Sequence, residues 1–493
     1  MALALELHMG LNRRRRPASA APSYTIPANN RFIVYGDSRA ANGTSVSGIT
    51  GTSRQVLRRW AWAPNVAAID PRWRLAGDED PGNGTIFMGN FGVAGQRTDN
   101  YLTLPRATAA MGYTWAALHS AAVIFLIGGV NNFKAANNMT GAFGNMQTLV
   151  NYWTNPANCG GQQKLVVIID ETPIGINEAG ASANGMSAAN AALFRTYAGD
   201  LRGLDYRQPG GNPACIVVPI FETFLDPASG PTLTNYRGLS DDGTHTASMA
   251  AMIMARMAAA ELAPFAAAAG FTDQVSPHLA NAANPTALNS NPRMTGSGGS
   301  VSGTGVTLHG SLPTGWVFQG SGTFTTIDVT PSTTINANGE TEWILDLAWT
   351  GSSGATALLR NNISSAQLSS AGFNVGDIAQ LAGLIKTDAG SDNFGGIGLW
   401  LVAQSTVTTN NYTATTRGST SNGVLKSAAY GGSFDGGGDQ LYDMTPQIAT
   451  SQITNGGGAW NSSQAIQPAV HFSFGPGSGS ARVRVAQLTC FKV

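Results

Sequence analysis

The chain has 493 residues and a mass of 51.0 kDa, a length that predicts two or three domains. Charged residues make up only 11% of it and the formal net charge is zero, so we expect no broad basic surface and no nucleic-acid partner. The hydrophobic fraction is 43%, and no apolar run is long enough to form a transmembrane helix. We therefore expect folded domains and no membrane partner.

The first 28 residues read as a flexible arm. Its apolar residues precede the arginines Arg13 to Arg16, the reverse of their order in a secretory signal, so we expect no signal peptide. The arginines have two open interpretations: a solvated tail, or a docking peptide for a larger assembly.

Residues 29–270 alternate short apolar runs with stretches long enough for helices, such as Ser187–Gly203. The runs lack polar alternation, which is typical of strands buried on both faces of a parallel sheet. After the last run, Met249, Ile253 and Met257 recur at helical spacing. The pattern predicts a doubly wound, flavodoxin-like α/β domain with helices on both faces of a five-stranded parallel sheet. The five predicted strands are Phe32–Tyr35, Thr85–Met88, Ala121–Ile127, Leu165–Ile169 and Ile216–Phe221.

Residues 271–312 are rich in Asn, Pro, Ser and Gly and are predicted to be a linker. Residues 313–493 then show short β-type runs separated by turn clusters, and Trp343–Trp349 alternates between large apolar residues and others. This texture predicts an all-β sandwich of jelly-roll type, serving carbohydrate binding or assembly. The segment Ala366–Leu384 is ambiguous between helix and strand.

Four polar segments follow predicted strands of the α/β domain at their carboxyl ends, where ligands bind in open α/β sheets. Each alone is common in ordinary turns, but the four occur in separate places and in a definite order. They are Gly36-Asp37-Ser38, the turn around Gly95, Gly129-Val130-Asn131-Asn132 and Asp242-Gly243-Thr244-His245.

These residue types fit nucleophilic catalysis on a carbonyl. A serine hydroxyl such as that of Ser38 becomes a nucleophile when a base takes its proton, and a histidine such as His245 does so near neutral pH. A carboxylate fixes the histidine tautomer and stabilises the imidazolium. Asp242 and Asp241 both qualify, and the three-residue spacing to His245 favours Asp242.

The four blocks together resemble the SGNH (GDSL-type) hydrolase family over about residues 29–270. The resemblance implies a Ser38, His245 and Asp242 triad, with an oxyanion hole formed by the backbone N–H groups of Ser38 and Gly95 and the side chain of Asn131. Asn132 stands where the family usually has Asp, at a position that supports the loop rather than the reaction.

Further residues of these blocks are weaker candidates for substrate contact: Asp37, Arg97 and Asn132. No metal-binding or nucleotide-binding motif is present, so we expect no metal and no cofactor.

Several aromatic residues of the C-terminal half lie among polar residues and are candidates for stacking on sugars, with sandwich core as the alternative. They are Tyr412, Tyr430 and Trp460. A calcium loop at Asp435 and Asp439 stays open beside a plain turn.

The family's fold makes its fourth and fifth strands neighbours. By that resemblance, Cys159 and Cys215 are a candidate disulfide, and Cys490 is expected to be a free, buried thiol.

The function expected from the resemblance is a serine esterase that removes O-acetyl groups from a polysaccharide. A lipid or thioester hydrolase, and a receptor-binding structural tail protein with a vestigial hydrolase domain, are alternatives. The arm, linker and sandwich resemble the layout of bacteriophage tail fibre or tailspike deacetylases. That layout implies a virion-associated or extracellular homotrimer acting on a bacterial surface glycan, with tail or baseplate partners at the N-terminal arm. A secreted plant-polysaccharide acetylesterase is the alternative setting.

Overall fold

The computed structural model describes residues 24–43, 54–56, 62–76, 90–102, 112–177, 180–237, 239–272, 287–336, 341–375, 377–388, 391–406, 412–415, 442–444, 448–449 and 459–492. They belong to two units, a parallel-sheet domain and a β-sandwich. This is the predicted fold class, a doubly wound α/β domain followed by an all-β domain.

The parallel-sheet domain is built on the strand order β3-β1-β5-β6-β7, with β4 also paired to β1, and every pairing is parallel. All residues of β5 and β6 are buried, as the apolar runs predict for strands covered on both faces. The predicted strand Thr85–Met88 lies outside the described residues. The strands are β1 (Arg31–Gly36), β3 (Arg74–Leu75), β4 (Asn90–Gly92), β5 (Val123–Ile127), β6 (Leu165–Ile169) and β7 (Cys215–Val218).

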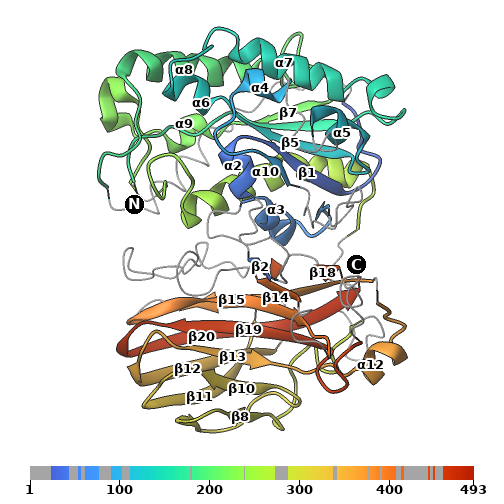
Figure 1. Ribbon diagram of the computed structural model, residues 1–493, viewed down its shortest axis with the longest axis vertical. Coiled ribbons are helices and arrows are strands. Elements are labelled where there is room, and N and C mark those ends of the chain that lie inside the picture. The colour runs from blue at the N-terminus through green and yellow to red at the C-terminus, as the bar shows by residue number, and fades with distance from the viewer. Residues whose placement is uncertain are drawn as a thin grey trace. The chain divides into compact units, whose positions relative to one another are not determined.

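Helices cover this sheet, with α7 and α8 over one face and α10 at the opposite face (Figure 1). The side chain of Ser187 accepts a hydrogen bond from the backbone N–H of Asn190 and so caps α8 at the predicted start. The helices are α2 (Ser38–Gly43), α4 (Thr98–Tyr101), α5 (Tyr113–Leu118), α6 (Val130–Lys134), α7 (Ala142–Trp153), α8 (Ala188–Arg202), α9 (Phe221–Phe224) and α10 (Ser248–Ala268), with 3-10 turns η2 (Pro156–Asn158) and η3 (Pro227–Thr232).

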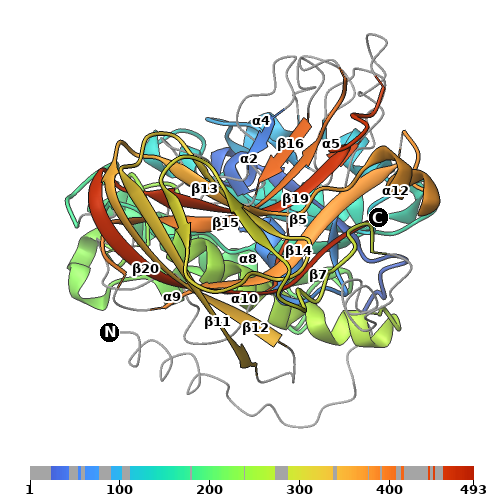
Figure 2. The same cartoon turned by 90° about the horizontal axis from the view of Figure 1, so that it is seen from below.

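The β-sandwich has two sheets, ordered β2-β16-β15-β19-β13-β10-β8 and β17-β14-β20-β12-β11-β9, with β18 paired to β14 (Figure 2). Trp343, Leu345 and Leu347 of β12 are buried while Ala348 is exposed, so the predicted alternation holds. Its elements are β2 (Arg54–Val56), α3 (Ala63–Ile69), β8 (Ser300–Ser302), β9 (Val306–Leu308), β10 (Val317–Ser321), β11 (Thr326–Ile335), β12 (Thr341–Ser352), β13 (Thr356–Arg360), α12 (Ser365–Ser370), β14 (Ile378–Thr387), β15 (Phe394–Ala403), β16 (Tyr412–Thr415), β17 (Tyr442–Met444), β18 (Ile448–Ala449), β19 (Ile466–Phe474) and β20 (Gly477–Lys492).

The predicted linker, residues 271–312, is wrong in its second half, because β8 and β9 lie there and pair with β10 and β11. Glycine in this segment serves close packing rather than flexibility. A Cβ on Gly299 would lie 2.5 Å from the carbonyl oxygen of Pro313, and Gly303 has a φ of +101°. The ambiguous segment Ala366–Leu384 contains both elements, α12 followed by β14.

Two further boundaries differ from the prediction. Within residues 29–270, β2 and α3 belong to the sandwich unit, where β2 pairs with β16. Near the end of the predicted arm, Tyr24 packs on Phe265, and the backbone N–H of Thr25 donates to Pro213. Residues 1–23 lie outside the described residues.

The predicted Cys159–Cys215 disulfide is wrong, since both thiols are free and buried. Cys159 lies in the turn after η2, six residues before β6 begins, and its thiol donates to the carbonyl of Trp153 at 3.1 Å. That orientation leaves it unavailable to Cys215 at the start of β7. Cys490 is free and buried, as predicted.

Candidate active site

The first predicted block forms a tight turn at the carboxyl end of β1. Gly36 has a φ of +144°, and a Cβ there would lie 1.8 Å from the carbonyl oxygen of Ile127 on the neighbouring strand β5. That carbonyl accepts a hydrogen bond from the backbone N–H of Asp37 at 3.2 Å. Only glycine permits this approach, and it places Ser38 at the start of α2, above the sheet.

The structure brings Ser38, His245 and Asp242 together in one hydrogen-bonded chain, although 207 positions separate Ser38 from His245. The Nε2 atom of His245 lies 2.9 Å from the Oγ atom of Ser38. On the other side of the ring, Nδ1 lies 2.9 Å from an oxygen of Asp242. Asp242, rather than Asp241, therefore supplies the carboxylate that contacts the ring.

Asp242 is held in its charged form. Burial raises the pKa of Asp242, but hydrogen bonds outweigh burial and hold that pKa well below its usual range. Besides the ring of His245, the backbone N–H groups of Thr244 and His245 both donate to the carboxylate at 2.9 Å. An ionised Asp242 is the form that orients the imidazole and stabilises it when it takes a proton.

The loop that carries His245 is anchored at Gly243. Its φ is +92°, and a Cβ would lie 2.0 Å from the carbonyl oxygen of Ala183. The carbonyl of Gly243 accepts from the backbone N–H of Gly175 at 2.8 Å. Lys134, at the end of α6, donates to the Thr244 hydroxyl at 3.3 Å and joins this loop to the segment containing Asn131.

The three donors predicted for an oxyanion hole are the backbone N–H groups of Ser38 and Gly95 and the side chain of Asn131. No described residue accepts a hydrogen bond from the backbone N–H of Ser38 or of Gly95. Gly95 has a φ of +76° in a turn closed by the backbone hydrogen bond from Gln96 to Val93. The Asn131 side chain donates one N–H to the carbonyl of Gln96 at 2.8 Å. Its amide nitrogen carries a second N–H for a ligand.

Two tyrosine side chains pack so closely against the two glycines before Asn131 that no larger residue fits there. A Cβ on Gly128 would lie 2.1 Å from the hydroxyl of Tyr101, and a Cβ on Gly129 would lie 2.5 Å from the ring of Tyr197. The hydroxyl of Tyr197 donates to the carbonyl of Gly128 at 2.6 Å. These contacts fix the turn from β5 into α6, on which Asn131 lies.

Two predicted substrate-contact residues are corrected by the structure. Asp37 and Asn132 are fully buried and so have no surface to offer a substrate. Asn132 accepts from the backbone N–H of Thr98 at 3.0 Å and donates to the carbonyls of Asn137 and Asn138, which is a loop-supporting role. Arg97 occupies the N-cap position of α4, where its backbone N–H donates to the side chain of Asn100, and its guanidinium forms an ion pair with Asp99.

The candidate glycan-stacking residues lie in the sandwich unit. Trp460 is half-buried and packs against the sandwich core and Phe373. Tyr412 belongs to β16, and its side chain lies outside the described residues, as do Tyr430, Asp435 and Asp439.

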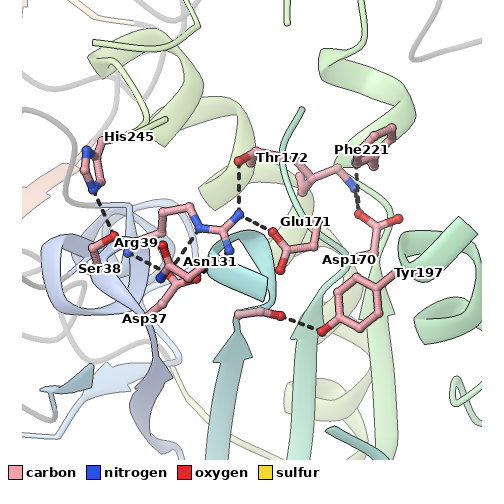
Figure 3. Close-up of polar contacts among 12 residues, drawn as sticks. Asp37, Ser38, Arg39, Asn131, Asp170, Glu171, Thr172, Tyr197, Phe221 and His245 are labelled. Carbon is pink, nitrogen blue, oxygen red and sulfur yellow. Dashed lines mark hydrogen bonds and ion pairs between the residues drawn. The ribbon is translucent and has the colours of Figure 1, made fainter. Parts of the chain in front are cut away.

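Sequence reasoning missed the charged residues beneath the nucleophile. Arg39, directly after Ser38, is buried and pairs with both Asp37 and Glu171 (Figure 3). Asp170 is also buried and pairs with Arg202. One signal was available, because Asp170 and Glu171 immediately follow the apolar run of β6, at the edge of the sheet where ligands are expected.

The hydrogen bond between Ser38 and His245 is an arrangement that can carry out acyl transfer, with Ser38 as the nucleophile and His245 as its base. Among the described residues, no group of His, Cys, Asp or Glu side chains has the arrangement of a metal site. None of the described helices combines the length and apolarity needed to cross a bilayer.

No protein-family model and no curated protein matches the sequence. Among solved structures, a member of the lipolytic protein G-D-S-L family from Veillonella parvula is 13% identical, with a TM-score of 0.25, covering 48% of this chain and 96% of that one. The acetyl xylan esterase AlAXEase is 14% identical, with a TM-score of 0.27 and coverage of 46% and 96%. A structure of carbohydrate-binding modules of the β-sandwich superfamily is 10% identical, with a TM-score of 0.24. It covers 36% of this chain, and this chain spans 57% of its length.

Proposed function

We propose that this protein is an SGNH-type serine ester hydrolase. The observation that carries the proposal is the hydrogen-bonded chain from Ser38 through His245 to Asp242. In the reaction, His245 takes the proton of Ser38 as its oxygen attacks the ester carbonyl. The oxyanion accepts hydrogen bonds from the backbone N–H groups of Ser38 and Gly95 and from the side-chain amide of Asn131. Each such donor stabilises the transition state by roughly 3–4 kcal/mol. Protonated His245 then donates to the leaving alcohol, and water repeats the sequence on the acyl-enzyme.

The test is hydrolysis of p-nitrophenyl acetate by the wild type and by Ser38→Ala and His245→Ala. Each variant should lose kcat by several orders of magnitude while keeping its melting temperature. Ser187→Ala is the control, because it removes a serine hydroxyl that caps α8 outside the catalytic chain. Equal turnover by wild type and Ser38→Ala would refute the proposal.

The substrate we propose is an O-acetylated polysaccharide. Two features support this choice: the sequence has no long apolar segment near the crevice that would form a lipase lid, and a β-sandwich accompanies the hydrolase domain. Acetate release from purified polysaccharides should exceed hydrolysis of C8 to C12 esters. A preference for the long chains would instead indicate a lipid or thioester hydrolase.

We propose further that the glycan belongs to a bacterial surface and that the protein is a phage tail component, with its sandwich serving glycan binding or assembly. The layout of arm, hydrolase domain and sandwich supports this setting. Deacetylation of capsule or O-antigen is the expected result. Activity on plant xylan or pectin alone would favour a secreted plant-polysaccharide esterase, and binding without turnover would favour a structural tail protein.

A further inference from the structure

We propose that Arg39 is a positioning residue, which together with Asp37 and Glu171 locks the turn that presents Ser38 to the substrate. The inference rests on the proposed esterase function but concerns residues that the catalytic chain does not contain. We name these three residues the Arg39 clamp.

The clamp closes a ring around Ser38. The guanidinium of Arg39 donates from Nε to one oxygen of Asp37 at 3.1 Å and from Nη2 to the other at 2.7 Å. The backbone N–H of Arg39 donates to the same carboxylate at 2.9 Å. Because the residues on both sides of Ser38 are tied to each other, the backbone of Ser38 has little freedom, and its N–H keeps its direction.

The clamp also ties this turn to a strand two positions away in the sheet. The remaining terminal nitrogen of Arg39 pairs with Glu171, and the same nitrogen lies 3.4 Å from the hydroxyl of Thr172 (Figure 3). Glu171 follows β6, whereas Ser38 follows β1, and β5 lies between the two strands. The long side chain of Arg39 therefore crosses the carboxyl end of β5, the strand that leads to Asn131.

Glu171 holds its part of the clamp in a strained backbone conformation. Its φ is +98°, a region that residues with a side chain rarely adopt, and the cost of such a conformation is on the order of 1–3 kcal/mol. Strain of this kind persists where the surrounding structure requires it, and it gathers at functional sites. Its preceding neighbour Asp170 points to the start of α9, accepting from the backbone N–H groups of Ile220 and Phe221.

A purely structural role does not account for the clamp. Arg39, Asp37 and Glu171 are all buried, and a buried ion pair is often no more stabilising than apolar side chains of equal volume. No described residue donates a hydrogen bond to one oxygen of Glu171, which adds to the cost of burying the charges. A guanidinium differs from an apolar side chain in offering a rigid fork of N–H donors with fixed directions.

The chain contains a matched control with the same geometry away from the site. Arg207 donates through its backbone N–H and Nε to one oxygen of Asp205 at 2.8 and 2.7 Å, and through Nη2 to the other at 2.5 Å. Its third nitrogen pairs with Glu261 at 2.6 Å. Asp205 and Arg207 lie in the turn between α8 and β7, at the amino end of the strand, and Glu261 lies on α10. The Arg207 side chain is 29% exposed, whereas that of Arg39 is fully buried.

The test compares two double-mutant cycles in the full-length protein: Arg39→Lys with Glu171→Gln, and Arg207→Lys with Glu261→Gln. For each variant, kcat is expressed per active serine, counted by labelling to completion with a fluorophosphonate, and the labelling rate constant is also measured. Melting temperatures show whether each variant folds, and hydrogen exchange of the peptide containing residues 37–43 reports the turn independently of activity.

We expect Arg39→Lys to lower kcat and the labelling rate constant by roughly tenfold, with KM within about twofold, because a small misplacement of a reacting group is costly. Glu171→Gln should lower kcat less, and the double variant should lose less than the product of the single losses. Exchange in residues 37–43 should accelerate. The Arg207 and Glu261 variants should change the melting temperature but leave kcat and this exchange within about twofold.

The proposal is overturned if the Arg39 and Arg207 cycles behave alike, with lower melting temperatures and unchanged kcat per active serine. If wild type and Ser38→Ala have equal activity, the esterase proposal fails instead. The exchange of residues 37–43 still decides the clamp in that case, since unchanged exchange in Arg39→Lys would refute it.

Discussion

At the scale of single residues, the site depends on a few contacts that admit one side chain only. Asp242 makes three of them, to the ring of His245 and to two backbone N–H groups, and its neighbour Asp241 makes none of these. Gly243 is a second such position. Its carbonyl accepts from the backbone N–H of Gly175, and the carbonyl of Ala183 occupies the space that a Cβ on Gly243 would need.

Asp242→Asn should therefore lower kcat by about 10³- to 10⁴-fold, since an amide does not stabilise the imidazolium and favours the wrong tautomer. Asp241→Asn should stay within a few-fold of wild type. Initial rates with p-nitrophenyl acetate at saturating concentration decide between the two. A larger loss of kcat for Asp241→Asn than for Asp242→Asn would show that the assignment of Asp242 is wrong.

Gly243→Ala should destabilise the parallel-sheet domain and reduce activity. A left-handed conformation costs alanine roughly 1–2 kcal/mol, and the clash with the Ala183 carbonyl adds to that cost and displaces His245. Gly210→Ala is the control, since Gly210 has a φ of +76° but no atom within 4 Å of its would-be Cβ. The melting temperature from scanning calorimetry and the kcat should both fall more for Gly243→Ala than for Gly210→Ala. Equal losses would mean that the loop containing Ala183 moves to accommodate the added methyl group.

At the scale of elements, the carboxyl end of β6 carries an excess of buried negative charge. Within the part of the chain that the structure describes, the three carboxyl groups of Asp37, Asp170 and Glu171 pair with two guanidinium groups, those of Arg39 and Arg202. Burial raises the pKa of Asp170 to about 6 and the pKa of Glu171 to about 7, and the paired arginines only partly offset it.

This charge excess predicts how stability varies with pH. Between about pH 4 and 7 the folded domain binds protons that the unfolded chain has already lost, so the free energy of unfolding falls as the pH rises. The contribution is fully present below the ordinary pKa values of the two carboxyls and is lost above about pH 7. Asp242, whose pKa is lowered, acts in the opposite direction and loses its contribution in stronger acid.

Glu171→Gln should flatten this dependence. The melting temperature of wild type should fall between pH 5 and pH 8, and the variant should remove roughly 3–6 °C of that fall. Glu222→Gln, which removes a half-exposed partner of Arg195, should leave the fall unchanged. A wild-type melting temperature that rises over this range with no contribution from Glu171 would contradict the assignment.

At the scale of the whole molecule, the chain joins a doubly wound domain to a sandwich, and the three cysteines are distributed between them as buried free thiols. Burial raises the pKa of each of these thiols, which keeps them in the unreactive protonated form.

Thiol counting tests this distribution. Denatured, non-reduced protein should react with three equivalents of a thiol reagent, and the native protein with almost none, because all three thiols are buried. If the denatured, non-reduced protein reacts with only one equivalent of the thiol reagent, the result would support a disulfide between Cys159 and Cys215.

The proposed tail-protein setting predicts a homotrimer. Sedimentation equilibrium should give a mass of about 153 kDa, three times the 51.0 kDa of the chain. A mass near that of one chain would remove the trimer while leaving the esterase proposal intact.

The sequence by itself determined the fold class and the positions of four strands, β1, β5, β6 and β7, and of the helices α8 and α10. Strands buried on both faces appear as uninterrupted apolar runs, as in β5 and β6, and α8 begins at its capping serine. It also determined the candidate blocks, because the carboxyl ends of parallel strands converge at one edge. Only the tertiary structure decided which distant groups meet. The pairing of β2 with β16, the orientation of Cys159 and the contact between Arg39 and Glu171 leave no periodic signal, since each depends on how the chain returns to a place in space.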